Sequence, residues 1–217
     1  MKKESITFTC GKLKLEGRYY KAEVEGRRPA VVVCHPHPMY GGSMDNNVTE
    51  SIAGALAKVP INALLFNFRG VGRSQGKYDN GVGEQDDIRA ALDWLEKRDG
   101  VDNSKLGLSG YSFGAGVALP VGCADSRVKA FALVSPFLQG TEDAGLRTCP
   151  KPKLIVGGDE DEIIGSDLFV LYEREAAEPK QVEIIKGADH FWLGFEDEMA
   201  DIVAGFFADT FIKGQGI

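Results

Sequence analysis

Residues 106–119 read Leu-Gly-Leu-Ser-Gly-Tyr-Ser-Phe-Gly-Ala-Gly-Val-Ala-Leu. An apolar run at residues 106–108 is followed by the pattern Gly-x-Ser-x-Gly at residues 110–114 and then by a segment of helical character. In this pattern a sharp turn from strand to helix lifts a serine hydroxyl above a sheet, and small residues flank the serine because backbone segments approach closely there. The sequence therefore predicts a strand–turn–helix unit, a nucleophile elbow, with Ser112 at the turn.

A second match to the pattern occurs at residues 72–76, Gly-Arg-Ser-Gln-Gly. Ser74 in this match is followed by a turn-rich stretch, residues 76–81, and not by a helix. The setting therefore favours Ser112 as a nucleophile over Ser74. The alternative for Ser112 is that a tight turn between strand and helix simply requires a small residue.

A serine hydroxyl is a poor nucleophile near neutral pH, so it needs a base within hydrogen-bond reach and a third group that fixes the tautomer of the base. The chain has three histidines, at positions 35, 37 and 190, and only His190 follows Ser112. His190 lies in a loop after an apolar run that ends at Ile185, and such sheets build their sites in loops at the carboxyl ends of strands. We predict His190 to be the base.

Four consecutive carboxylates, at residues 159–162, follow the apolar run at residues 154–156. A cluster of this kind is ordinarily a solvated turn. It also lies between Ser112 and His190, where the chain order Ser, acid, His places the orienting carboxylate. The pattern alone does not choose among the four side chains.

Short apolar runs alternate with segments of helical spacing along most of the chain. The expected strands cover residues 30–34, 63–66, 106–108, 130–134, 154–156 and 182–185, and the expected helices cover residues 48–58, 84–98, 113–121, 168–175 and 199–212. Residues 5–9 and 13–20 alternate polar with apolar side chains and predict an opening hairpin. We therefore expect an α/β fold with a mostly parallel, twisted sheet of about seven to eight strands, an N-terminal antiparallel hairpin and helices on both faces, as one domain over residues 1–217.

Composition excludes several classes of partner. The net charge is −7 and the sequence pI is about 5.1, so a nucleic acid or an anionic membrane surface would be repelled on average. The first ten residues alternate polar with apolar side chains, which predicts a strand and not an export signal, and no apolar run reaches membrane-spanning length. The four cysteines lack CxxC spacing, which is typical of reduced thiols, so we expect a soluble cytoplasmic protein. We also expect a monomer or a homodimer.

Four motifs together carry a family resemblance: residues 35–38 (His-Pro-His-Pro) with Gly-Gly at 41–42, residues 67–74 (Asn-Phe-Arg-Gly-Val-Gly-Arg-Ser), residues 110–114, and residues 187–191 (Gly-Ala-Asp-His-Phe). With these motifs the chain resembles the α/β-hydrolase superfamily, and in particular its small cap-less bacterial branch of dienelactone-hydrolase-like serine esterases. The resemblance runs from about residue 30 to the C-terminus. It departs at Asn67, where relatives often have Asp.

The resemblance implies roles for several residues. The Gly-[Asp/Glu]-x-Asp loop of such enzymes makes Asp161 the triad acid, ahead of Asp159. The oxyanion hole of this fold uses the backbone N–H after the nucleophile, here that of Phe113, and one from the loop after the first parallel strand. Pro36 and Pro38 have no N–H, so His37 or Met39 must supply the second donor, and the alignment with the His-Gly of similar enzymes favours His37.

These features imply a carboxylesterase-like serine hydrolase that cleaves small acyl esters or thioesters without a cofactor or a metal. Residues 70–75 (Gly-Val-Gly-Arg-Ser-Gln) lack the third glycine of a dinucleotide-binding motif, because Gln75 occupies that position. Two alternatives are a non-catalytic binding protein with a hydrolase fold and a metal-dependent hydrolase that uses His35, His37 and His190 with a carboxylate. Residues 136–152 are too few for a helical cap, which predicts a shallow pocket. Its candidate borders are Tyr40, Phe137, Phe191 and Trp192, and the alternative for each of these aromatic side chains is a place in the core.

Overall fold

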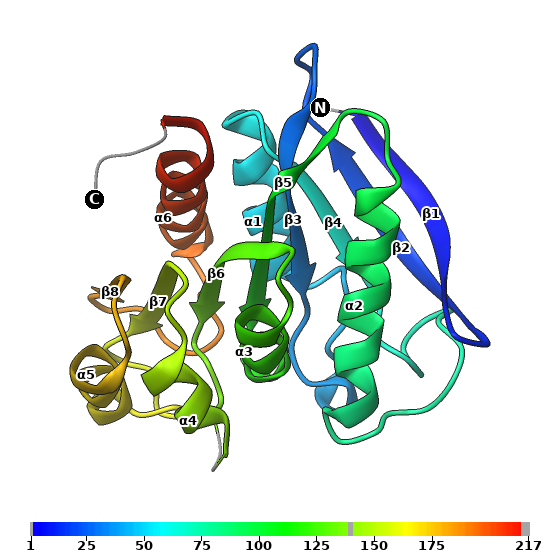
Figure 1. The fold of residues 1–217 in the computed structure, drawn as a ribbon. Coiled ribbons are helices and arrows are strands. Elements are labelled where there is room, and N and C mark those ends of the chain that lie inside the picture. The colour runs from blue at the N-terminus through cyan, green and yellow to red at the C-terminus, as the bar shows by residue number, and fades with distance from the viewer. Residues whose placement is uncertain (1, 139–140, 214–217) are drawn as a thin grey trace.

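Eight strands among the described residues form one sheet in the order β1-β2-β4-β3-β5-β6-β7-β8 (Figure 1). The computed structural model describes residues 2–138 and 141–213. The strands are β1 (Lys2–Cys10), β2 (Leu13–Lys21), β3 (Arg28–Cys34), β4 (Asn62–Phe66), β5 (Val101–Tyr111), β6 (Val128–Val134), β7 (Lys153–Gly158) and β8 (Lys180–Ile185). The pairs β1·β2 and β2·β4 are antiparallel and all other pairs are parallel, which confirms the predicted α/β-hydrolase fold with its opening hairpin.

Helices cover both faces of this sheet (Figure 1). They are α1 (Asn47–Lys58), α2 (Val82–Glu96), α3 (Phe113–Ala124), α4 (Thr141–Thr148), α5 (Ser166–Glu175) and α6 (Glu196–Ala208), with a short 3-10 turn at Pro38–Tyr40 and a π-helical turn at Asp209–Lys213. The sequence did not predict α4, which has little apolar spacing. No helix of the described segments is both long and apolar enough to cross a membrane.

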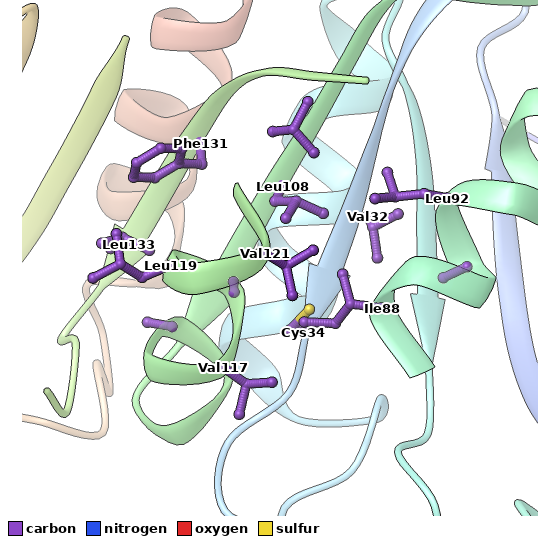
Figure 2. Close-up of a cluster of buried hydrophobic side chains, with 14 of the residues drawn as sticks. Val32, Cys34, Ile88, Leu92, Leu108, Val117, Leu119, Val121, Phe131 and Leu133 are labelled. Atoms are coloured by element: carbon purple, nitrogen blue, oxygen red, sulfur yellow. The ribbon is translucent and has the colours of Figure 1, made fainter. Parts of the chain in front are cut away.

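The core consists of two apolar layers, one on each face of the sheet. Val32 and Leu108 point to the face that α2 and α3 cover, whereas Val31 and Val33 point to the face of α1 and α6, since successive side chains of a strand alternate. Figure 2 shows part of the first layer, in which Ile88 and Leu92 of α2 belong to the same cluster as Val32. Burying one such side chain stabilises the fold by roughly 1.5–3 kcal/mol, which explains why the central strands are apolar on both faces.

The loop after β4 is fixed by an ion pair with α2. The guanidinium of Arg69 donates to the carboxylate of Asp87 at 2.7 Å, and the backbone N–H of Arg69 donates to the same carboxylate at 2.9 Å. The side chain of Asp87 is fully buried. Because a buried carboxylate needs several donors, this pair holds the loop against α2.

Ser74 belongs to the same loop and is buried. Its hydroxyl donates to the carbonyl of Asn67 at 2.6 Å and accepts from the N–H of Glu16 at 3.0 Å. The first bond closes the loop on itself, and the second joins the loop to β2. The structure therefore gives Ser74 a structural role, and the second Gly-x-Ser-x-Gly match closes a turn.

Asn67 also faces Glu16. Its side-chain amide donates to the Glu16 carboxylate at 2.8 Å, and its carbonyl oxygen accepts from the N–H of Met44 at 2.7 Å. An aspartate at this position would place a second negative charge against the buried Glu16 and could not donate when ionised. The departure from the family pattern at position 67 thus has a local physical reason.

We predict that Ser74→Ala lowers the free energy of unfolding by about 1–3 kcal/mol, because it leaves a buried donor and a buried acceptor without a partner. Urea denaturation measures the change. Ser126→Ala is the control, since Ser126 is exposed, and it should change the free energy by less than about 0.5 kcal/mol. Equal stability of the two variants would contradict the structural role of Ser74.

Candidate active site

Ser112 lies at the turn between β5 and α3 and has an unusual backbone conformation, with φ of 53° and ψ of −116°. Its N–H donates to the carbonyl of Val134 in β6 at 2.9 Å, and its carbonyl accepts from the N–H groups of Ala115 and Gly116. A non-glycine residue at positive φ costs of order 1–3 kcal/mol, and such residues cluster at functional sites. The turn thus presents the serine side chain at the carboxyl edge of the sheet.

The two glycines of the motif make this turn possible. A Cβ added at Gly110 would lie 2.4 Å from the carbonyl oxygen of Gly114, and one added at Gly114 would lie 2.5 Å from the carbonyl oxygens of Cys34 and His35. Side chains at either position would collide with backbone atoms. The start of α3 therefore packs directly against the end of β3.

The structure brings Ser112, His190 and Asp161 into one hydrogen-bonded line. Ser112 Oγ lies 3.0 Å from His190 Nε2, and His190 Nδ1 lies 2.9 Å from Asp161 Oδ2 and 3.1 Å from Oδ1. An ionised carboxylate only accepts, so Nδ1 carries the proton and Nε2 presents its lone pair to the serine hydroxyl. His190 and Asp161 are both buried, which strengthens these bonds by excluding water.

Asp161 is held as a carboxylate. Burial by itself would raise the pKa of this group, but hydrogen bonds from His190 and from the N–H of Ile164 outweigh burial and lower the pKa. The N–H groups of Ile163 and Ile164 reach Asp161 Oδ1 at 3.1 and 2.9 Å. A charged acceptor is therefore available to the imidazole.

Asp159, the other candidate for the triad acid, makes a different contact. Asp159 Oδ1 accepts from the N–H of Gly187 at 2.6 Å, and this bond joins the loop after β7 to the loop after β8. Asp159 and Glu160 are exposed, whereas Asp161 turns inward. Of these carboxylates, Asp161 is the one that bonds His190.

The loop after β3 contains the candidate second oxyanion donor. The N–H of Met39 donates to His37 Nδ1 at 3.2 Å, so the N–H of His37 itself is the donor left for substrate in this part of the loop. Phe113 is the first residue of α3, and helix geometry leaves its N–H without an intrahelical partner. The rings of His37 and Phe113 lie 4.8 Å apart, so the two donors come from adjacent segments.

His35 and His37 do not join His190 in a metal site. His35 is fully buried, donates from Nδ1 to the carbonyl of Pro36 at 2.6 Å and accepts at Nε2 from the N–H of Phe68 at 3.1 Å. His37 Nε2 contacts the hydroxyl of Tyr78 at 3.2 Å. Within the described part of the chain, no three His, Cys, Asp or Glu side chains gather in a way that could hold a metal ion.

This chain is similar to known proteins in sequence and in fold. Residues 29–149 match the model of the family described as X-Pro dipeptidyl-peptidase (S15 family). An uncharacterized protein of Rickettsia prowazekii is 39% identical over 206 residues, with 91% of this chain and 86% of that protein covered. The solved structure of an alpha-beta serine hydrolase homologue from Coxiella burnetii has a TM-score of 0.86 at 33% identity, with 94% of this chain and 97% of that one covered.

The chain belongs to the family described as X-Pro dipeptidyl-peptidase (S15 family) and is an α/β hydrolase. A second solved structure, described as a member of a/b serine hydrolase without lid from Xanthomonas campestris, has a TM-score of 0.86 at 26% identity and covers 98% of this chain and 96% of that one. These matches confirm the resemblance to small α/β hydrolases that the motifs indicated.

Exposed aromatic side chains of this α/β hydrolase lie in loops at the edge of the sheet where Ser112 follows β5. Tyr40, Phe137 and Phe191 are 88%, 40% and 56% exposed and follow β3, β6 and β8, whose carboxyl ends lie at the same edge of the sheet. Trp192 is fully buried, so of the two positions that the sequence left open for it, pocket border or core, it occupies the core. The segment between β6 and β7 contains one short helix, α4, among its described residues.

His35 makes the stability of this hydrolase depend on pH. Burial lowers the pKa of His35 to about 4 because it disfavours the charged imidazolium, and this outweighs the bond to the Pro36 carbonyl, which raises the pKa. A proton on Nε2 would also face the N–H of Phe68. The unfolded chain binds this proton near the ordinary histidine pKa of about 6.5, so the stabilisation is complete above that pH and is lost as the pH falls from about 6.5 to about 4.

We predict that wild type loses about 3 kcal/mol more unfolding free energy than His35→Gln between pH 7 and pH 4. A glutamine oxygen can accept from Phe68 N–H and takes up no proton in this range. Urea denaturation at several pH values measures both curves. Parallel curves for the two proteins would show that His35 does not titrate on unfolding.

Proposed function

We propose that this chain is a carboxylesterase-like serine hydrolase that cleaves small acyl esters or thioesters through an acyl-enzyme. In this proposal Ser112 is the nucleophile, His190 the general base and Asp161 the carboxylate that orients the imidazole. The observation that carries the proposal is the 3.0 Å contact between Ser112 Oγ and His190 Nε2 on a strained turn. The contact supplies a base at the distance that proton transfer needs.

The reaction would proceed in two halves. Ser112 Oγ attacks the acyl carbon while its proton passes to His190 Nε2, and collapse of the tetrahedral species expels the alcohol or thiol, which takes that proton. Water then attacks the acyl-enzyme with His190 as base and regenerates the serine. The N–H groups of Phe113 and His37 would stabilise the oxyanion in both halves.

A non-catalytic binding protein is the competing function. Neither the fold nor the family distinguishes it from an enzyme, because the same fold hosts both. A fluorophosphonate probe does, since it reacts only with an activated serine. Labelling of wild type but not of Ser112→Ala would support the enzyme, and absence of labelling in wild type would favour the binding protein.

The proposal also covers the location, the substrate class and the oligomeric state of the enzyme. We expect a cytoplasmic enzyme with reduced cysteines, acting on a small-molecule acyl substrate as a monomer or a homodimer. Neither a cofactor nor a metal is required by the proposed steps. Activity that survives a chelator would agree with these steps, whereas its loss would favour a metal-dependent reaction.

Ser112→Ala and His190→Ala should each lower esterase turnover by about four orders of magnitude, because the members of such a set act as one unit. Ser74→Ala should retain turnover near that of wild type, since Ser74 bonds only to backbone groups of β2 and its own loop. Hydrolysis of p-nitrophenyl acetate measures all three. An inactive Ser74→Ala with an active Ser112→Ala would reverse the assignment.

Asp161→Asn should lower turnover by roughly four orders of magnitude, because an amide can donate to the imidazole and so permits the wrong tautomer. Asp159→Asn is the matched control, two residues away and outside the line to Ser112, and should keep most of the turnover. The two variants are compared in the same esterase assay. Comparable losses in both would mean that the carboxylates act through the loop and not through His190.

Acetyl to butyryl esters should show higher kcat/KM than octanoyl or longer esters, because an open site leaves a long chain in water and each such methylene forgoes about 0.8 kcal/mol of binding. The exposed rings of Tyr40 and Phe191 agree with an open site. A series of p-nitrophenyl esters measures the preference. A rise in kcat/KM that continues through long chains would show a deep apolar channel instead.

A further inference from the structure

Four rings form a cluster beside the proposed oxyanion donors: those of His37, Tyr40, Tyr78 and Phe113. The centroid of the Tyr78 ring lies 5.1 Å from that of His37 and 5.7 Å from that of Phe113. Tyr78 therefore contacts both residues whose backbone N–H groups are proposed to stabilise the oxyanion. It belongs to a third segment, the loop between β4 and α2, which no step of the proposed reaction uses.

Hydrogen bonds hold the His37 ring at both of its nitrogens. The N–H of Met39 donates to Nδ1 at 3.2 Å, so Nδ1 presents its lone pair. Burial lowers the pKa of His37, which favours the neutral ring, and the single ring proton is then on Nε2. Nε2 lies 3.2 Å from the Tyr78 hydroxyl and donates to its oxygen. Rotation of the ring would break both bonds.

The loop that carries Tyr78 is itself fixed by Glu84, a fully buried residue in the first turn of α2. The Glu84 carboxylate accepts from the N–H groups of Asp79 at 2.8 Å and Gly81 at 2.9 Å. At the start of the loop, Gly70 has φ of 79°, and a Cβ there would lie 3.1 Å from the backbone nitrogen of Tyr78. The backbone on both sides of Tyr78 is therefore held closely, so the ring has a firm support.

We propose that Tyr78 is a positioning residue that holds the two oxyanion donors, the backbone N–H groups of His37 and Phe113, in a fixed arrangement. This inference rests on the proposed function, because only a reaction through an oxyanion needs these donors. The donors lie in different segments: His37 precedes the 3-10 turn after β3, and Phe113 begins α3. Since Tyr78 contacts both, it restricts the motion of one relative to the other. Donors held in place stabilise the developing charge without reorganisation during the reaction.

The first test is Tyr78→Phe, which removes the acceptor for His37 Nε2 and keeps a ring against Phe113. Loss of a whole oxyanion donor lowers kcat by about 10²–10³-fold, so we expect a displaced donor to lower kcat for p-nitrophenyl acetate by roughly 10-fold. KM should stay within about two-fold of wild type, because acylation and deacylation both use the donors and slow together. Tyr19→Phe is the matched control, since the Tyr19 ring packs on Trp94 near the last turn of α2, and it should leave both constants unchanged.

A short-chain trifluoromethyl ketone gives a readout that a merely structural role would not change. The Ser112 oxygen adds to the ketone carbon, the serine proton passes to His190, and the carbonyl oxygen becomes an oxyanion. The inhibition constant should rise in Tyr78→Phe by about the factor by which kcat/KM falls. Titration with a fluorophosphonate gives the active fraction of each variant, so unfolded protein does not enter either value. An unchanged inhibition constant would overturn the proposal.

His37→Asn tests whether Tyr78 acts through the His37 ring. Asparagine keeps the backbone N–H of residue 37 and can accept from the N–H of Met39, as Nδ1 of the histidine does, but its side chain is too short to reach Tyr78. In this background Tyr78→Phe should lower kcat by less than about two-fold, because the bond that it removes is already absent. A loss of about 10-fold in both backgrounds, or a raised KM at unchanged kcat, would overturn the proposal.

A failure of the proposed function gives a different result. If wild type neither hydrolyses p-nitrophenyl acetate nor reacts with a fluorophosphonate, the serine hydrolase proposal is wrong and the inference falls with it. If wild type does both, and Tyr78→Phe matches Tyr19→Phe in kcat and in the inhibition constant, the hydrolase stands and the positioning role of Tyr78 is wrong.

Discussion

The backbone turn at Ser112 is the constraint on which the arrangement of this molecule depends. A serine at φ of 53° is unfavourable in an isolated chain. The turn persists because the serine N–H bonds to β6 and because neither glycine has a side chain that would clash. Gly110 lets the end of β5 approach the start of α3, and Gly114 lets α3 approach the end of β3. Large apolar layers on both faces of the sheet supply the stability that offsets this local cost. The sheet therefore acts as a rigid support for a strained loop.

Parallel pairing accounts for the convergence of distant residues. β3, β5, β7 and β8 all end at the same edge of the sheet, so the loops that follow them bring His37, Ser112, Asp161 and His190 to one place although they span more than 150 residues of sequence. Each loop is then fixed by its own polar contacts. The bond between Asp159 and Gly187 joins the two loops that carry Asp161 and His190.

The sequence predicted the sheet and the positions of the candidate residues because both depend on local patterns. Buried parallel strands need continuous apolar runs, and the turn at Ser112 needs glycine on either side. The choice between Asp159 and Asp161 could be made by family resemblance but not from the residues themselves, since it depends on which side chain points inward. The place of Trp192, at the pocket border or in the core, stayed open for the same reason, because a buried indole N–H needs a partner such as Ser135 that the sequence does not show.

The contact between Asn67 and Glu16 should couple the residues at these two positions as the family diverges. A buried glutamate beside an amide is a matched donor and acceptor, whereas a glutamate beside an aspartate is a pair of like charges. Arg73 already pairs with Glu16 at 2.7 Å. Relatives with aspartate at the position of Asn67 should therefore lack a buried carboxylate at the position of Glu16, or add a further cation besides the one at the position of Arg73. The two sites, 51 residues apart in the chain, would change together in evolution, and a substitution accepted in one homologue would be deleterious when transferred alone to another.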